Sequence, residues 1–309
     1  MAISAVCSAV CASAQESYMR GRRFAATDFT AGKVCIVEAD GRVGWSHPAK
    51  SSNDLWVLPG GTVLFGNGKG AKEVSFKDGT VRFEHKTRSE TFGVQRLDDG
   101  GTLVAECSSG KLIEYAPDGK TVRAEVSLLA SKITPQRPLP GGHGFMRNAR
   151  KLKNGNYLCA LNGASEVVEF DPSGKRVWSA KVPGQAHSVA RKPDGNTLAS
   201  GGDSLARKGV STALYEFNPK GEVVWKLSNE DLPGRPLKFV AGFQVLPNGN
   251  IVICNWLGHG NLGKAPHLIE VTRDKKVVWT YGDHGQFKTI SNIHVFAEGD
   301  TPTPADGLH

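Results

Sequence analysis

Residues 169–178 read Glu-Phe-Asp-Pro-Ser-Gly-Lys-Arg-Val-Trp, and residues 216–225 read Glu-Phe-Asn-Pro-Lys-Gly-Glu-Val-Val-Trp. Each stretch joins the end of an apolar strand to a second strand through a turn that contains Asp or Asn and Gly, which is typical of a β-hairpin. Each hairpin is preceded by another short turn between two strands, such as Lys192-Pro193-Asp194-Gly195. The repeated unit is therefore four short strands.

Five complete units follow one another at a spacing of about 40 to 55 residues, which is the sequence sign of a β-propeller. Their first turns are Leu58-Pro59-Gly60-Gly61, Leu97-Asp98-Asp99-Gly100, Leu152-Lys153-Asn154-Gly155, Lys192-Pro193-Asp194-Gly195 and Leu246-Pro247-Asn248-Gly249.

The two ends of the chain supply a sixth unit. Residues 33–45 contain only the later strands of a unit, and residues 290–300 contain only the first strand and its turn. Pairing these segments would close a ring and remove two free strand edges. The sequence predicts an all-β fold, a six-bladed propeller of four-stranded antiparallel blades over residues 22–300. Residues 1–21 form a leader and lead-in, and residues 301–309 a tail.

Two sets of side chains recur at fixed places in the units, and we expect both to pack between blades. One is the apolar position in the first strand, three residues before the turn leucine, and the other is an aromatic position in the last strand. The first set is Leu55, Val94, Ala149, Val189, Phe243 and Ile293, and the second is Trp45, Phe83, Trp178, Trp225 and Trp279.

Composition describes an ordinary globular chain, with 39% hydrophobic and 22% charged residues. The formal net charge of +8 comes from scattered Lys and Arg, so we expect no nucleic-acid partner, and no apolar run is long enough to span a membrane. The cysteines of the repeats, at 35, 107, 159 and 254, show neither a metal motif nor a disulfide framework. We expect them to be buried free thiols.

Residues 1–14 are small and apolar and end in Ala12-Ser13-Ala14, which resembles the cleavage site of a secretory signal. This leader predicts a periplasmic or secreted protein. A positively charged start is missing, so a cytoplasmic location remains the alternative if the leader is not a signal.

Loop length indicates which face of the ring carries function. The turns on one face are all short, whereas the connections on the other face include residues 127–145, 203–212, 227–240, 256–267 and 281–289. Long irregular loops in a compact domain usually carry binding or catalytic residues. These loops are modestly basic, which favours an anionic or polyhydroxyl ligand.

The candidate catalytic residues lie where first strands begin on this face. His187 would be a general base, and Arg147 and Asn148 would hold developing negative charge. The same side chains could instead satisfy buried backbone groups at the mouth of the channel.

The candidate substrate-binding residues surround the same axis. Asp54 and other polar residues occupy first-strand positions where a core strand would be apolar, and Trp256 stands at the rim, where it could stack on a sugar ring or anchor a loop. The complete set is Asn53, Asp54, Glu106, His143, Asn255, Trp256 and His259.

A metal site is a weaker expectation. Glu106, Asn67 and Asn255, with Asp28 as a further candidate, carry the oxygen ligands that Ca²⁺ takes, and this set resembles that of lactonase-type six-bladed propellers.

Residues 185–189 with 193–198, and residues 252–260, resemble those of bacterial quinoprotein-like (PQQ-binding-like) β-propeller repeat proteins. The resemblance covers nearly the whole chain and implies the fold but little about activity. We do not expect pyrroloquinoline quinone itself, because the quinoprotein dehydrogenases have eight blades, a longer chain and a vicinal cysteine pair. A more distant resemblance to arylsulfotransferase propellers would place His187, Arg147 and Asn148 in a sulfotransferase-like site.

Two functional classes remain open. The first is an exported enzyme of unresolved reaction class that acts on a carbohydrate or other small anionic substrate in an axial pocket. The second is a non-catalytic propeller that binds a ligand or a protein partner with the same face, and fold alone does not decide between them.

Overall fold

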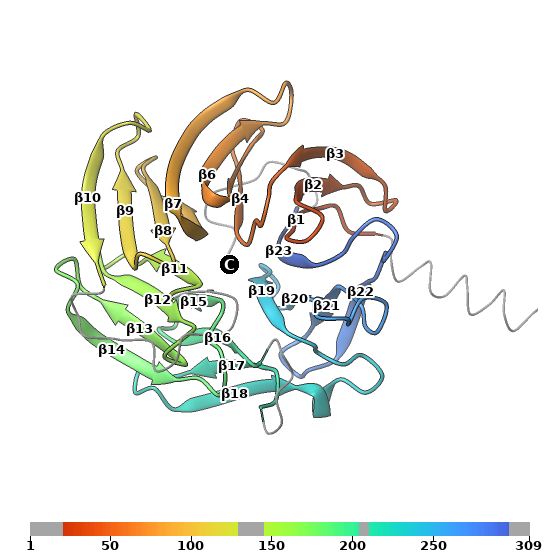
Figure 1. Ribbon diagram of the computed structural model, residues 1–309. Coiled ribbons are helices and arrows are strands. Elements are labelled where there is room, and N and C mark those ends of the chain that lie inside the picture. Colours follow the sequence, from red (N-terminus) through yellow and green to blue (C-terminus); the bar gives the residue numbers. More distant parts are fainter. Residues whose placement is uncertain (1–20, 129–144, 204–209, 297–309) are drawn as a thin grey trace, which may run out of the picture.

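The computed structural model describes residues 21–128, 145–203 and 210–296, and in these the chain forms six four-stranded antiparallel blades around a central axis (Figure 1). The predicted six-bladed propeller is confirmed. The first blade contains β4 (Leu55–Leu58), β5 (Thr62–Gly66), β6 (Gly68–Ser75) and β7 (Val81–Arg96), and the second contains β7, β8 (Thr102–Glu106), β9 (Lys111–Tyr115) and β10 (Val122–Ser127). The third contains β11 (Asn148–Lys151), β12 (Tyr157–Leu161), β13 (Glu166–Phe170) and β14 (Arg176–Lys181), and the fourth contains β15 (Val189–Arg191), β16 (Thr197–Gly201), β17 (Ala213–Phe217) and β18 (Val223–Ser228). The fifth contains β19 (Val240–Val245), β20 (Ile251–Asn255), β21 (Leu268–Val271) and β22 (Val277–Tyr281), and the sixth contains β23 (Ile290–Val295), β1 (Phe24–Asp28), β2 (Lys33–Val37) and β3 (Val43–Pro48).

The last of these blades closes the ring. The C-terminal strand β23 pairs antiparallel with the N-terminal strand β1, with Phe24 opposite Val295 and Ala26 opposite Ile293. The predicted closure is confirmed, and the N-terminal share of the blade begins earlier than expected, at Phe24. The join pairs the inner edge of β1, which would otherwise be left free.

Strand β7 belongs to two blades. Its first half pairs with β6 as the outer strand of one blade, and its second half pairs with β8 as the inner strand of the next. These two blades therefore form one seven-stranded sheet.

The two recurring sets pack as predicted. Leu55, Val94 and their equivalents in the other inner strands are completely buried. Each aromatic of the outer strands contacts the following blade: the Trp45 ring lies 4.8 Å from the Phe76 ring, and the Trp225 indole donates to the Arg273 carbonyl at 3.0 Å. The four cysteines of the repeats are buried and free, as expected.

A glutamate on the third strand of five blades connects that blade to the next one, a role not predicted from the sequence, and four of the five glutamates are buried. Each glutamate forms an ion pair with a base of the following blade, on the short-turn side of the ring. The pairs are Glu73 with Arg96, Glu114 with Lys151, Glu169 with Arg191, Glu216 with Arg273 and Glu270 with Arg22.

Short turns close the strands on that side because their sequences fit the backbone they need. Gly195 has a positive φ of 86°, and the Asp194 carboxylate accepts a hydrogen bond of 2.9 Å from the Asn196 amide. The short turns leave the opposite face as the place for long connections.

Candidate functional site

A pocket opens at the axis on the long-loop face, with a cavity volume of about 50 Å³. The described residues of its walls combine one arginine, two histidines, three amides and three aromatic rings, and no carboxylate is among them. The lining residues are Phe29, Asn53, Arg147, Asn162, Gln185, His187, Phe239, Ala241, Trp256 and His259.

The propeller positions these side chains through two kinds of strand end. Arg147 and His187 precede the inner strands β11 and β15, and Asn162 and Trp256 follow the second strands β12 and β20. Inner strands begin, and second strands end, on the same face, because neighbouring strands are antiparallel. The pocket therefore lies on the face that loop length predicted.

The His187 ring is buried and fixed in orientation. Its Nδ1 lies 2.6 Å from the Ala241 carbonyl oxygen, and the Phe239 ring packs edge-on against it with centroids 5.1 Å apart. A carbonyl oxygen only accepts, so Nδ1 carries the proton of the neutral ring. The basic nitrogen is then Nε2, which is the arrangement a general base requires.

Arg147 is a cation without a carboxylate partner among the described residues. Its guanidinium lies 4.5 Å from the centre of the Phe92 ring, and its buried Nε has no hydrogen-bond partner. Burial lowers the pKa of the Arg147 guanidinium, and the charge of the nearby Glu90 carboxylate partly opposes this. An anionic ligand would supply the missing counter-charge.

Two buried amide side chains that line the pocket each have one atom without a hydrogen-bond partner. Asn162 is 2% exposed and its Nδ2 donates to the Ala186 carbonyl at 3.4 Å, so its Oδ1, which has no partner, is the free acceptor. Asn53 is 6% exposed and its Nδ2 has no partner. Buried polar atoms are normally satisfied. These atoms therefore mark places where a ligand could complete the hydrogen bonding.

Of the residues named from sequence, the structure brings Arg147, His187, Asn53, Trp256 and His259 together in this pocket. Trp256 and His259 form its rim, with ring centroids 5.1 Å apart. Asn148 is buried directly after Arg147 but is not part of the lining. His143 lies outside the described residues.

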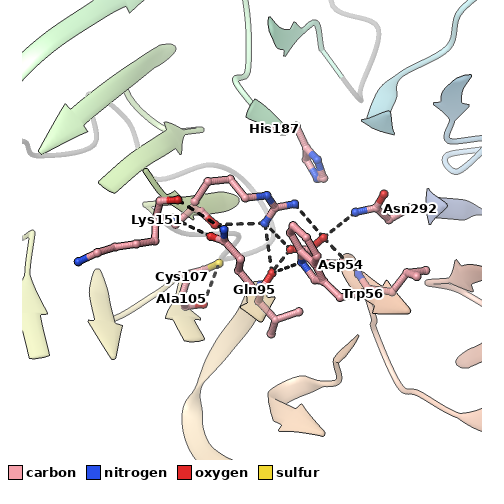
Figure 2. Close-up of polar contacts among 12 residues, drawn as sticks. Asp54, Trp56, Gln95, Ala105, Cys107, Lys151, His187 and Asn292 are labelled. Atoms are coloured by element: carbon pink, nitrogen blue, oxygen red, sulfur yellow. Dashed lines mark hydrogen bonds and ion pairs between the residues drawn. The ribbon is translucent and has the colours of Figure 1, made fainter. Parts of the chain in front are cut away.

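Asp54 lies outside the pocket lining, in a buried network that joins inner strands. Arg150 binds both of its oxygens, at 2.6 and 3.0 Å, and the Val94 amide and the Asn292 side chain also donate to it. Figure 2 shows Asp54 at the centre of these contacts, with Trp56 and Asn292 beside it and His187 away from it. Burial raises the pKa of the Asp54 carboxyl and Arg150 lowers it, and because its neighbours are donors the site fits the ionised form.

Glu106 and Asn255 also form hydrogen bonds with residues outside the pocket lining. The Glu106 carboxylate lies 3.0 Å from His85 Nε2 and accepts a 2.6 Å bond from Ser109. Burial would raise the pKa of Glu106, and the hydrogen bonds from Ser109, Thr87 and His85 hold it below its usual range. The Asn255 side chain hydrogen-bonds to the backbone of Pro236, Lys238 and Pro266.

Three of the expected calcium ligands, Glu106, Asn255 and Asp28, accept hydrogen bonds from protein groups. The side-chain oxygen of Asn255 accepts from the Lys238 amide at 2.6 Å, and both oxygens of Asp28 accept from backbone amides of the segment before β23. Asn67 is not among the residues that line the pocket. Within the described ranges, no three His, Cys, Asp or Glu side chains are grouped to hold a metal ion.

Five of the lining residues were not predicted from the sequence: Phe29, Asn162, Gln185, Phe239 and Ala241. Gln185 could have been found, because it lies two positions before His187 on an extended segment and therefore shares its side. Asn162 directly follows Leu161, the last residue of β12, and the second strands end on this face. The two phenylalanines lie just outside strands, at positions for which the repeat gives no orientation.

No helix in the described part of the chain is long and apolar enough to cross a membrane.

Comparison with known proteins agrees with the fold. The structure is similar to a protein of unknown function from Bacteroides caccae, with 27% sequence identity and a TM-score of 0.75 over 90% of this chain and 99% of that chain. It is also similar to a catalytically inactive histidine-to-alanine variant of virginiamycin B lyase from Staphylococcus aureus with quinupristin, with 13% identity and a TM-score of 0.54 over 84% of each chain.

A chain of a nidogen–laminin complex is similar as well, with 13% identity and a TM-score of 0.60 over 89% of this chain and 98% of that chain. No protein-family model matches the sequence, and no curated protein matches it. The distant likenesses concern the propeller, so the function has to be argued from the pocket.

Proposed function

We propose that this propeller is an enzyme that binds a small anionic substrate in the axial pocket and uses His187 as a general base. The observation that carries the proposal is the combination, in one pocket, of Arg147, which forms no ion pair with a described carboxylate, and a histidine whose tautomer is fixed. A partly buried cation of this kind favours an anion, and a positioned imidazole favours proton transfer.

The chemistry follows from the positions of the two groups. His187 Nε2 takes a proton from the bound substrate, and the electron pair stays on the substrate atom that lost it. Arg147 and the Asn53 amide would stabilise the negative charge that develops there, because hydrogen-bond donors fixed in a water-poor site cost no reorganisation during the reaction. The Ala241 carbonyl stabilises the imidazolium that forms, since Nδ1–H donates to it.

Two similarities to other proteins are relevant to the proposed function. A protein that is similar in fold, virginiamycin B lyase, has a catalytically inactive variant in which a histidine is replaced by alanine, so a fold of this kind is compatible with a histidine-dependent site. We interpret the resemblance of the repeats to quinoprotein-like proteins as a similarity of fold. We further propose export, on the strength of the leader that ends at Ala14.

The first test is thermal unfolding of the protein with sulfate esters, carboxylates, phosphates, sugars and quinupristin. A ligand at about 100 times its dissociation constant should stabilise the fold by roughly 2.7 kcal/mol. We expect an anion to give this shift and Arg147→Met to abolish it. The control Arg82→Met removes a cation from the exposed half of β7 and should leave the shift intact.

Turnover of that ligand tests the role of His187. His187→Asn places an amide donor near the Nδ1 position but has no base, so we expect binding to survive and turnover to fall by about 10²- to 10⁴-fold. His47→Asn on the outer strand β3 is the matched control. Undiminished turnover in His187→Asn would remove the proposed base, and a ligand shift that Arg147→Met leaves unchanged would move the site elsewhere.

A further inference from the structure

We propose that the substrate is a sugar acid, a pyranose ring that carries one carboxylate and free hydroxyl groups. This inference rests on the proposed function, since it uses the same pocket. It is carried by the unsatisfied groups that line the pocket and by the rings at its rim.

The charge of the ligand follows from a count of the lining charges. The pocket contains one arginine, and no carboxylate among the lining residues competes for it. One carboxylate neutralises one guanidinium, and the planar fork of Arg matches a carboxylate with two parallel hydrogen bonds. A phosphate monoester would bring a charge near −2 and leave about one negative charge unpaired in a partly buried site. The pocket therefore favours a monoanion.

The hydroxyl groups follow from the two unsatisfied amides. The Asn162 Oδ1 needs a donor, because its Nδ2 is oriented to the Ala186 carbonyl. The Asn53 Nδ2 needs an acceptor. A hydroxyl group both donates and accepts, so neighbouring sugar hydroxyls could satisfy both amides, whereas a plain ring acid would leave them unpaired at a cost.

The ring of the proposed ligand is inferred from the aromatic side chains of the pocket. Phe239 contacts both His187 and Trp256, with centroids 5.1 and 6.2 Å apart, and Phe29 also contributes to the lining. Trp256 is half-buried at the rim, so part of its ring remains accessible. Pockets with apolar rings and a few placed polar groups suit a ring ligand that has an apolar face and polar edges.

Titration calorimetry with defined probes tests the inference on the whole protein. The sugar acids are D-galacturonate, D-glucuronate and D-mannuronate. Methyl α-D-galactoside lacks the charge, cyclohexanecarboxylate lacks the hydroxyls, and D-galactose 6-phosphate carries the higher charge. We expect one sugar acid to bind at least about tenfold more tightly than each of these three probes, as one charge-assisted hydrogen bond would provide.

Two variants assign the selectivity to residues. Arg147→Met should weaken binding of the sugar acid by about ten- to a hundredfold without changing the affinity for methyl α-D-galactoside, and Arg147→Lys should restore part of the loss. Asn162→Leu should weaken the sugar acid but not cyclohexanecarboxylate. Asn156→Ala, in the turn between β11 and β12, is the control for loss of an amide.

The possible results separate this inference from the proposed function. If no sugar acid binds, or if the neutral galactoside or the phosphate binds as tightly, the sugar-acid assignment is overturned. The proposed enzyme then still stands if another anion requires Arg147 and is turned over with His187. If a sugar acid binds as described but His187→Asn loses no turnover, the ligand class stands and the proposed catalytic base fails.

Discussion

Gly258 shows how one missing side chain shapes the rim of the pocket. A Cβ built on this residue would lie 1.9 Å from the end of the Trp256 ring, far inside any real contact. The indole therefore lies directly against the Gly258 backbone, and only glycine leaves room for it there. The ring is held on its other side by contacts with Phe239 and His259.

Gly258→Ala should force the Trp256 ring out of its position. Because the ring is at the rim and can swing toward solvent, we expect a modest loss of stability of about 1 kcal/mol together with a change in tryptophan fluorescence. Urea unfolding and emission spectra measure the two effects. The fluorescence change should vanish in a Trp256→Phe background, and Gly282→Ala, where a Cβ has at least 3.5 Å of room, should show neither effect. An unchanged spectrum would mean that the ring does not occupy this position.

At the scale of the element, the end of strand β20 holds two long connections in place. The Asn255 side chain accepts from the Lys238 amide at 2.6 Å and donates to the Pro236 and Pro266 carbonyls, each at 3.0 Å. Residue 255 is completely buried. It thereby fixes the segments that carry Phe239 and Trp256, and acts on the pocket by positioning its walls.

Asn255→Ala should loosen both segments. The loss of three hydrogen bonds to buried backbone groups should destabilise the protein by about 1–3 kcal/mol, and amide exchange at Lys238 should become faster. Asn250→Ala, at the other end of the same strand, removes a 2.8 Å bond to Glu270 and should lower stability without affecting exchange at Lys238. Equal exchange at Lys238 in the wild type and Asn255→Ala would contradict the positioning role.

The same scale explains which parts of the site could be predicted from sequence. Arg147 and His187 were identified because inner strands begin at equivalent places in every repeat, and a period of two then gives the side they face. The partner of Asp54 could not be found in this way, because Arg150 lies 96 positions away on a different blade. The position of a residue in a repeat predicts which face it lies on, but not whether another side chain satisfies it.

At the scale of the whole molecule, the repeated glutamates link the blades in sequence. Glu216 is 1% exposed, binds Lys192 in its own blade and Arg273 in the next, and accepts a bond from Asn196. Burial alone would raise the pKa of Glu216, and these hydrogen bonds and charges hold it below its usual range. The pKa of Glu114 is held low in the same manner, chiefly by Lys151 and Tyr157 against the effect of burial.

Acid should therefore destabilise the ring. A carboxylate whose pKa is lower in the folded state stabilises the fold above its unfolded value, about 4.3 for Glu, and the contribution is lost as the pH falls through the folded value. We expect the free energy of unfolding, measured by urea titration at pH 7, 5, 4 and 3, to decrease below about pH 4. Glu216→Gln should be less stable at pH 7 and less sensitive to pH in this window, and an unaltered pH profile would show that Glu216 does not contribute.

The fold itself was predictable because each repeat states the same pattern, and the closing blade followed from the incomplete repeats at the two ends. The shared strand β7 was not, since its two halves belong to separate repeats and nothing in their spacing shows that the chain continues without a loop. The ties between blades were also missed, because a glutamate in a hairpin has no visible partner until the ring brings the next blade beside it.

The join between β1 and β23 also has a kinetic consequence. The Asp28 carboxylate accepts from the Thr289 amide, 261 positions later in the chain, so β1, which pairs locally with β2, gains its inner neighbour only when β23 joins it. The entropy of closing so long a loop grows only slowly with length, but contacts of such separation form late and slow the folding of β-rich proteins. During synthesis the nascent blades remain an open array, with a strand edge at risk of pairing with a neighbouring chain until β23 emerges.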